Sequence, residues 1–217
     1  MCDAICQHCT WDGVRNDIKQ CVKCCKACQK GKRGIKNCGK LPAKDVEGDP
    51  WDEMAVDLAG PWKSRAHGSD VEHCALTIVD TATQWCEIIP ITNKESENVS
   101  KLVDREWFCR CPRPLRCVCD NGSEFVGKEF QDSLDSYGVD QVGTTAKNPT
   151  ANAVVKRIHA MMGNMIRAQI ADTETIDDKH HDDPVPEMLA ACAWGTCSIM
   201  HSTAQFTLGD FFSRHVQ

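Results

Sequence analysis

L-R-C-V-C-D-N-G-S-E-F at residues 115–125 and N-P-T-A-N-A-V-V-K-R-I-H at residues 148–159 bound the stretch that decides the fold. The anchor of this stretch is Asp120. Leu115, Cys117 and Cys119 alternate with Arg116 and Val118 as in a short buried strand, and Asn121-Gly122 is a turn signal that ends such a strand. The pattern therefore places Asp120 at the carboxyl end of a buried strand.

A second acid has the same kind of setting. Asp57 lies in W-D-E-M-A-V-D-L-A-G-P-W at residues 51–62, where apolar residues alternate before Gly60-Pro61 ends the pattern. Two carboxylates carried at the ends of neighbouring strands can share one hard metal ion, because such ions prefer oxygen ligands. The two motifs together predict a metal site.

Three motifs resemble the three catalytic blocks of a known family. They are the Asp57 motif at residues 51–62, C-D-N-G-S-E-F-V-G-K-E-F at residues 119–130 and the motif at residues 148–159. The family is the integrases of retroviruses and gypsy-type long-terminal-repeat retrotransposons. The resemblance covers nearly the whole chain. It implies a polynucleotidyl transferase that uses Mg²⁺ or Mn²⁺, held by two Asp and one Glu, to integrate DNA.

The third acid of that family is absent here. Asp57 and Asp120 match the first two acids, but the position separated from Asp120 by thirty-five residues is Lys156. A lysine in place of a glutamate changes the local charge by two units, so we expect Lys156 to compete with the metal and to impair catalysis. Glu124 is open to two interpretations, either an additional ligand or a favourable charge at a helix start.

The order of predicted elements indicates the fold class. Three strands, a helix, a strand, a helix, a strand and a long helix follow one another, which is the order of an α/β, ribonuclease H-like mixed sheet with flanking helices. We expect a small partial zinc-finger segment at residues 1–40, a linker at 41–50 and a catalytic core-like domain at 51–217.

Composition restricts the class of protein. The chain has 217 residues and a formal net charge of −6, and it has no apolar run long enough for a membrane span or a signal peptide. Its sixteen cysteines are spread through apparent strands and helices, which is typical of reduced thiols rather than of a disulfide framework. We expect an intracellular protein without membrane contact, and the resemblance implies the nucleus.

The charge is uneven along the chain. Lys19–Lys44 contains nine Lys or Arg and no acid, which favours either a phosphate-binding surface or a solvated linker. The resemblance implies DNA and further copies of the same chain, in a homo-oligomer, as partners. The candidate DNA contacts are Lys30, Lys32, Arg33, Arg157 and His159.

Cys25-x2-Cys28 has the spacing with which two thiolates bind one zinc ion. The resemblance implies that these cysteines are the second half of an integrase zinc domain, whose two histidines would precede Met1, so we expect a truncated and incomplete Zn²⁺ site. A second hypothesis is a four-cysteine site in which Cys6 and Cys9 join this pair. A third is that none of them binds metal.

The sequence thus predicts a retrotransposon-type integrase with impaired catalysis. The alternative is a non-catalytic DNA- or protein-binding module derived from an integrase, and a nuclease of the same fold is a further alternative.

Overall fold

A computed structural model describes residues 2–31, 49–66, 69–143, 153–173 and 185–197. The core is a five-stranded mixed sheet with the order β3-β2-β1-β4-β5, in which β1, β2 and β3 are antiparallel and β4 and β5 run parallel to β1. The strands are β1 (Glu53–Ala66), β2 (Ser69–Asp80), β3 (Cys86–Ile91), β4 (Arg116–Cys119) and β5 (Asp140–Gly143).

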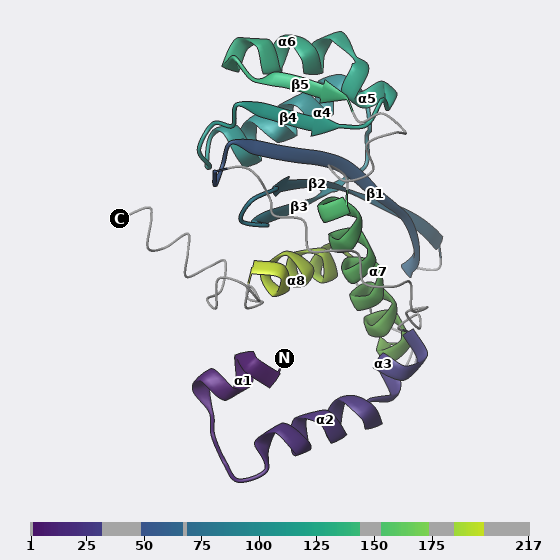
Figure 1. Cartoon of the computed structure of the whole chain (residues 1–217). Coiled ribbons are helices and arrows are strands. Elements are labelled where there is room, and N and C mark those ends of the chain that lie inside the picture. The colour runs from purple at the N-terminus through teal and green to yellow at the C-terminus, as the bar shows by residue number, and fades with distance from the viewer. Residues whose placement is uncertain (1, 32–48, 67–68, 144–152, 174–184, 198–217) are drawn as a thin grey trace.

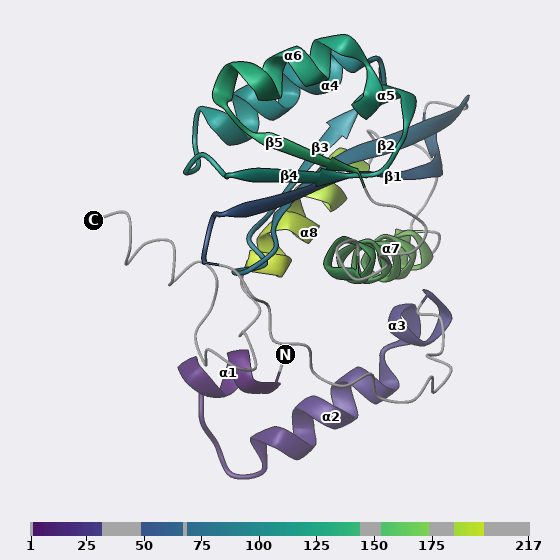
Figure 2. The same ribbon diagram turned by 45° about the horizontal axis from the view of Figure 1, so that its top comes forward.

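Helices cover both faces of this sheet (Figures 1 and 2). One face carries α4 (Ser96–Val103), the π-helical turn η1 (Asp104–Phe108), α5 (Ser123–Val126) and α6 (Lys128–Tyr137). The opposite face carries α7 (Ala153–Thr173) and α8 (Val185–Cys197). The α/β, ribonuclease H-like architecture predicted from the sequence is confirmed.

Each face of the sheet has its own hydrophobic core, because successive side chains of a strand point to opposite faces. The core under α4, α5 and α6 contains Met54, Val56, Cys117, Cys119, Trp107, Phe125, Phe130 and Leu134. The core under α7 and α8 contains Ala55, Ala59, Val118, Val155, Ile158, Met162, Met188 and Leu189. Asp57 lies on β1 and Asp120 directly follows β4, and side chains of both strands pack in both cores.

The turn η1 widens the helix that begins at α4. The Cys109 N–H donates to the carbonyl of Asp104 at 3.0 Å, which is the i to i−5 bond of a π turn. This turn directs Trp107 into the core, where it is 1% exposed, and leaves Phe108 stacked on Tyr137 at 4.3 Å between ring centroids. The Tyr137 hydroxyl donates to Asp104, which ties η1 to the end of α6.

Gly127 divides the helix that the sequence predicts for residues 123–137 into α5 and α6. A Cβ at Gly127 would lie 2.2 Å from Oγ of Ser96, so only glycine permits this approach to α4. The same Ser96 hydroxyl accepts the Phe130 N–H at 3.2 Å. The serine therefore fixes the start of α6 from a neighbouring helix.

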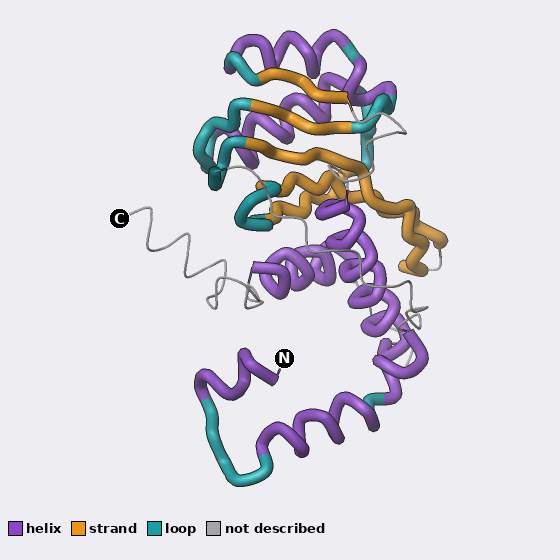
Figure 3. The backbone as a smooth tube through the Cα atoms, viewed as in Figure 1, coloured by secondary structure: helices purple, strands orange, loops and turns teal. Residues whose placement is uncertain are grey.

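The amino-terminal residues form α1 (Cys2–His8), α2 (Val14–Cys24) and α3 (Lys26–Gly31), an arm that runs beside the core (Figure 3). Helix α3 packs against α7. Residues 41–48 of the predicted linker lie outside the described residues. In the described part of the chain, no helix combines the length and the apolar character needed to cross a bilayer.

Candidate active site

Asp57 and Asp120 lie on neighbouring parallel strands. Asp57 belongs to β1, and Asp120 directly follows β4. The register pairs Ala55 with Val118, so each acid comes two residues later on its own strand. Because side chains alternate along a strand, both acids share the face of Ala55 and Val118, which α7 covers. The structure thus brings the two acids together, and their role as metal ligands stays a prediction.

Each carboxylate is anchored by one backbone hydrogen bond. The Leu58 N–H donates to Oδ1 of Asp57 at 2.8 Å, and the Gly122 N–H donates to Oδ1 of Asp120 at 2.9 Å. Both side chains are only partly buried. Each of these hydrogen bonds uses Oδ1 of its carboxylate and leaves Oδ2 for a further contact.

The surroundings of Asp57 make its ionised form costly. Burial raises the pKa of the Asp57 carboxyl to about 6, although the Leu58 N–H lowers it. The negative charge of Asp120 raises this pKa further and the positive charge of Lys156 lowers it. Glu124 contributes a smaller increase. Asp57 is therefore sensitive to three charged neighbours that come from three separate segments.

Helix α7 brings Lys156 to the acids. Its buried stripe, which includes Val155 and Ile158, packs on the sheet face that carries Asp57 and Asp120. Lys156 is solvent-exposed, yet its ammonium is close enough to lower the pKa of Asp57. The cation predicted at the third acidic position thus acts on the first acid from the expected helix.

His159 lies between Asp57 and the second strand. Its Nδ1 is 3.8 Å from Oδ2 of Asp57, and its Nε2 is 3.1 Å from Oγ1 of the buried Thr77. Thr77 pairs with Asp57 across β1 and β2. Burial lowers the pKa of His159 to about 4, so the imidazole is neutral at physiological pH. His159 therefore faces the candidate site, where its predicted role as a DNA contact stays a prediction.

Sequence reasoning did not find Thr77. It lies in the apolar run C-A-L-T-I-V at residues 74–79, and nothing in that local pattern distinguishes it from an ordinary strand residue. Its partner His159 is 82 positions away in the chain. Only the packing of α7 on β2 makes this pair visible.

Glu124 is the remaining acid near the site. It lies in the first turn of α5, and its carboxyl group covers Gly122, where an added Cβ would lie 2.8 Å from the Glu124 side chain. Its Oε2 accepts the Ser123 hydroxyl at 3.3 Å. These contacts fit a charge at a helix start, and they give no sign of a third metal ligand.

The donor set does not fit the three-carboxylate site of the integrases. Asp57 and Asp120 offer oxygen ligands of the kind that Mg²⁺ prefers, but Lys156 offers an ammonium, which carries no lone pair and repels a cation. Among the residues that the structure describes, no group of three or more His, Cys, Asp and Glu side chains is placed to hold a metal ion. We therefore derive no metal-dependent step from this arrangement.

Two of the other candidate DNA contacts are exposed side chains of helices. Lys30 is exposed on α3, and Arg157 is exposed in the first turn of α7. Lys32 and Arg33 lie outside the described residues. Exposure of Lys30 and Arg157 is compatible with phosphate binding, which stays a prediction for all of them.

The candidate zinc ligands lie at the junction of α2 and α3. The Cys28 N–H approaches Sγ of Cys25 at 3.5 Å, so the two cysteines are neighbours in space. Cys6 lies in α1 and Cys9 follows it, and these two do not join the first pair as a group of metal ligands in the described structure. The zinc-binding segment is not shown, and both zinc hypotheses stay predictions.

Residues 55–149 match the family model described as the integrase core domain. This segment contains both Asp57 and Asp120. It ends before Lys156, so the match concerns the strands and the first helix layer.

Curated relatives point to the same family. The chain is 30% identical over 143 residues to the human gypsy retrotransposon integrase-like protein 1, and this match covers 65% of the chain and 26% of the relative. It is 29% identical over 143 residues to the Bos taurus protein, covering 65% of the chain and 28% of the relative. It is 21% identical over 160 residues to the Tf2-3 transposon polyprotein of Schizosaccharomyces pombe, and this match covers 73% of the chain and 12% of the polyprotein. The chain thus spans little more than a quarter of these relatives at most.

Solved structures share the fold. The catalytic core of the HTLV-2 integrase, solved in complex with magnesium in a trimeric form, aligns with a TM-score of 0.55 and 16% identity over 73% of this chain and 93% of that one. A simian T-cell lymphotropic virus intasome in complex with the B56 gamma subunit of PP2A aligns with a TM-score of 0.60 and 15% identity over 94% and 72%.

The matched segment is similar to integrase core domains, and its fold is of the ribonuclease H-like type. More particularly, the chain is similar to the gypsy retrotransposon integrase-like proteins, in agreement with the resemblance of its three motifs.

Proposed function

We propose that this chain is an integrase-type polypeptide of retrotransposon origin whose metal-dependent DNA integration is impaired. The observation that carries the proposal is the position of Lys156, whose charge acts on Asp57 within a donor set that otherwise resembles an integrase site. Lys156 is exposed, so solvent screens its charge, and its interaction with Asp57 is weaker than the value of about 4 kcal/mol for two unit charges about 4 Å apart at an effective dielectric of about 20. A protein cation beside the first acid still competes with Mg²⁺ or Mn²⁺.

The neighbouring groups do not offset this change. His159 is neutral at physiological pH and has nitrogen donors, whereas Mg²⁺ prefers oxygen. Glu124 is engaged with Ser123 at the start of α5. The described residues therefore support a site with two carboxylates and one ammonium, in which the internal cation partly replaces the metal.

The first test is DNA cleavage. We expect the unmodified chain to show no magnesium- or manganese-dependent nicking or strand transfer on a fluorescent DNA duplex that carries retrotransposon-like ends. The Asp57→Asn variant serves as the matched control, because it removes the charge of the first acid with little change in shape. Nicking by the unmodified chain that disappears in Asp57→Asn would show that the site is a working enzyme.

The alternative is a non-catalytic module that binds DNA or a protein. Arg157 is exposed near the start of α7, and this supports DNA as the partner because an exposed guanidinium can bind a backbone phosphate. A protein whose partner is DNA is expected in the nucleus. The trimeric and dimeric forms of the HTLV-2 core support self-association of this chain. In this proposal the Cys25 and Cys28 pair holds Zn²⁺ incompletely.

DNA binding is tested through its salt dependence. We expect Arg157→Ala to weaken binding to duplexes of any sequence and to reduce the slope of log affinity against log salt by about 1, because one phosphate contact is lost. Fluorescence anisotropy at several salt concentrations measures the slope. Arg105→Ala is the matched control, since Arg105 is exposed and bonded to Glu106 on the opposite face of the sheet. An unchanged slope in Arg157→Ala would favour a protein-binding module.

A further inference from the structure

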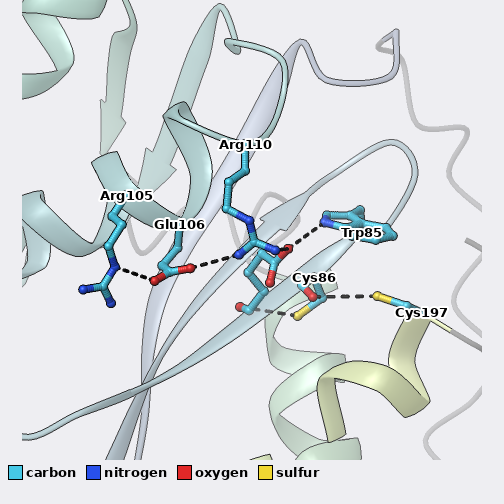
Figure 4. Close-up of polar contacts among 7 residues, drawn as sticks. Trp85, Cys86, Arg105, Glu106, Arg110 and Cys197 are labelled. Atoms are coloured by element: carbon cyan, nitrogen blue, oxygen red, sulfur yellow. Dashed lines mark hydrogen bonds and ion pairs between the residues drawn. The ribbon is translucent and has the colours of Figure 1, made fainter. Parts of the chain in front are cut away.

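The last turn of α8 lies against the first residue of β3. Cys86 begins β3 and is buried, and Cys197 ends α8 and is only partly buried. Sγ of Cys197 lies 3.9 Å from the carbonyl oxygen of Cys86. Figure 4 shows the Cys197 side chain pointing from the helix to the strand, at the edge of the polar cluster of Glu87 and Arg110.

The Cys86 thiol is buried close to Cys197. Burial raises the pKa of the Cys86 thiol well above its usual range, and the proximity of Cys197 adds to that increase. The Cys86 thiol now points to the carbonyl of Glu87 at 3.8 Å. The Cys197 sulfur, in turn, lies against the backbone of the residue that carries the Cys86 thiol.

We propose that Cys86 and Cys197 form a disulfide under sustained oxidation, which fastens α8 to the edge strand of the sheet. The partly exposed Cys197 reacts first with a hydroperoxide, giving a sulfenic acid and releasing one water molecule when hydrogen peroxide is the oxidant. The Cys86 thiolate then attacks that sulfur, forms the S–S bond and releases a second water molecule. The two thiols together lose two electrons and two protons to the peroxide.

The buried surroundings of the two thiols make this reaction slow. Because the pKa of both thiols is raised by burial, little thiolate exists at neutral pH and oxidation is slow. The same burial shields the product from soluble thiol reductants. The disulfide therefore forms only under prolonged oxidation and then fixes α8 to β3. It forms faster as the pH rises, because the thiolate fraction increases.

The experiment uses the full chain treated with hydrogen peroxide, followed by alkylation of the remaining thiols and non-reducing peptide mapping. We expect a peptide that joins Cys86 to Cys197, which is lost in Cys197→Ser and kept in Cys192→Ala. Cys197→Ser is a mild change because the side chain is partly exposed, and Cys192 is the nearby buried thiol that serves as the control.

Thermal unfolding supplies a second measurement. The cross-link spans 111 positions in the chain, so it restricts the unfolded state strongly. Oxidation should raise the midpoint by on the order of 5 °C in the unmodified protein and in Cys192→Ala, but not in Cys197→Ser. Faster oxidation at exposed cysteines such as Cys109 is compatible with the proposal. A cross-link of Cys86 to Cys192, or alkylation of both Cys86 and Cys197 after prolonged oxidation, would overturn it.

Discussion

Replacing Lys156 by glutamate is expected to raise the affinity for Mg²⁺ on the order of 100-fold, which corresponds to about 2.7 kcal/mol. The substitution removes a cation that already acts on Asp57 and adds an oxygen ligand on the same helix position. Electrostatic interactions of several kcal/mol per unit charge at close range make such a gain reasonable even after solvent screening. Calorimetric titration of both proteins with Mg²⁺ measures it.

Two controls separate the two parts of this effect. Lys156→Ala removes the cation without adding a ligand, so its affinity should fall between those of the unmodified chain and Lys156→Glu. Adding Asp57→Asn to Lys156→Glu should abolish the gain. Equal affinity in the unmodified and Lys156→Glu proteins would show that Lys156 does not disable the site.

The pH of the titration affects the result in a defined direction. The pKa of Asp57 is about 6, so this carboxyl is ionised at pH 7.5 and mostly protonated at pH 5. A protonated acid is a poor metal ligand, and loss of the Lys156 charge, which lowers the pKa of Asp57, raises that pKa further in Lys156→Glu. The gain should therefore be greatest well above pH 6 and should shrink as the pH falls toward 6.

Truncating Trp107 is expected to have the largest effect on stability. The side chain is 1% exposed, and its ring lies 6.0 Å from that of Trp51 within the core under α4 and α6. Trp107→Ala should lower the free energy of unfolding by about 3–5 kcal/mol, because a large aromatic side chain is replaced by a cavity. Chemical denaturation followed by far-ultraviolet circular dichroism measures the loss.

Trp107→Phe is a matched control for this prediction. Nε1 of Trp107 is a buried nitrogen without a hydrogen-bond partner among the described residues, so a phenylalanine loses ring volume but breaks no hydrogen bond. Its cost should be less than half that of Trp107→Ala. Similar costs for the two variants would mean that the indole nitrogen, rather than the packed ring, stabilises η1.

Local patterns predicted the fold well because they reflect short-range constraints. The apolar residues before Asp120 and the Asn121-Gly122 turn placed this acid at a strand end, and Cys117, Val118 and Cys119 are all buried because helices cover both faces of the sheet. The same pattern was wrong at Leu115, which it counts among the buried residues and which is 57% exposed. This leucine precedes β4, where its N–H donates to the carbonyl of Asp52, so it lies outside the covered part of the sheet.

Some features depended on more than one segment and were predicted less completely. The sequence indicates a single helix over residues 123–137, but the close approach of Ser96 requires Gly127 and divides it. Ser96 belongs to a different helix, so no property of residues 123–137 reveals this contact. Similarly, the sequence offers His159 as a candidate DNA contact, and only the packing of α7 reveals that its ring lies near Asp57 and Thr77.

By itself, the sequence determined the order of strands and helices, the two strand-borne acids and the lysine at the third position. These are properties of neighbouring residues and of spacing along one chain. Only the tertiary structure decided that Lys156 acts on Asp57, that His159 joins Thr77 and that Cys197 meets Cys86. The physical reason is that burial and through-space charge depend on segments separated by 82 to 111 positions, which meet only when the helices pack on the sheet.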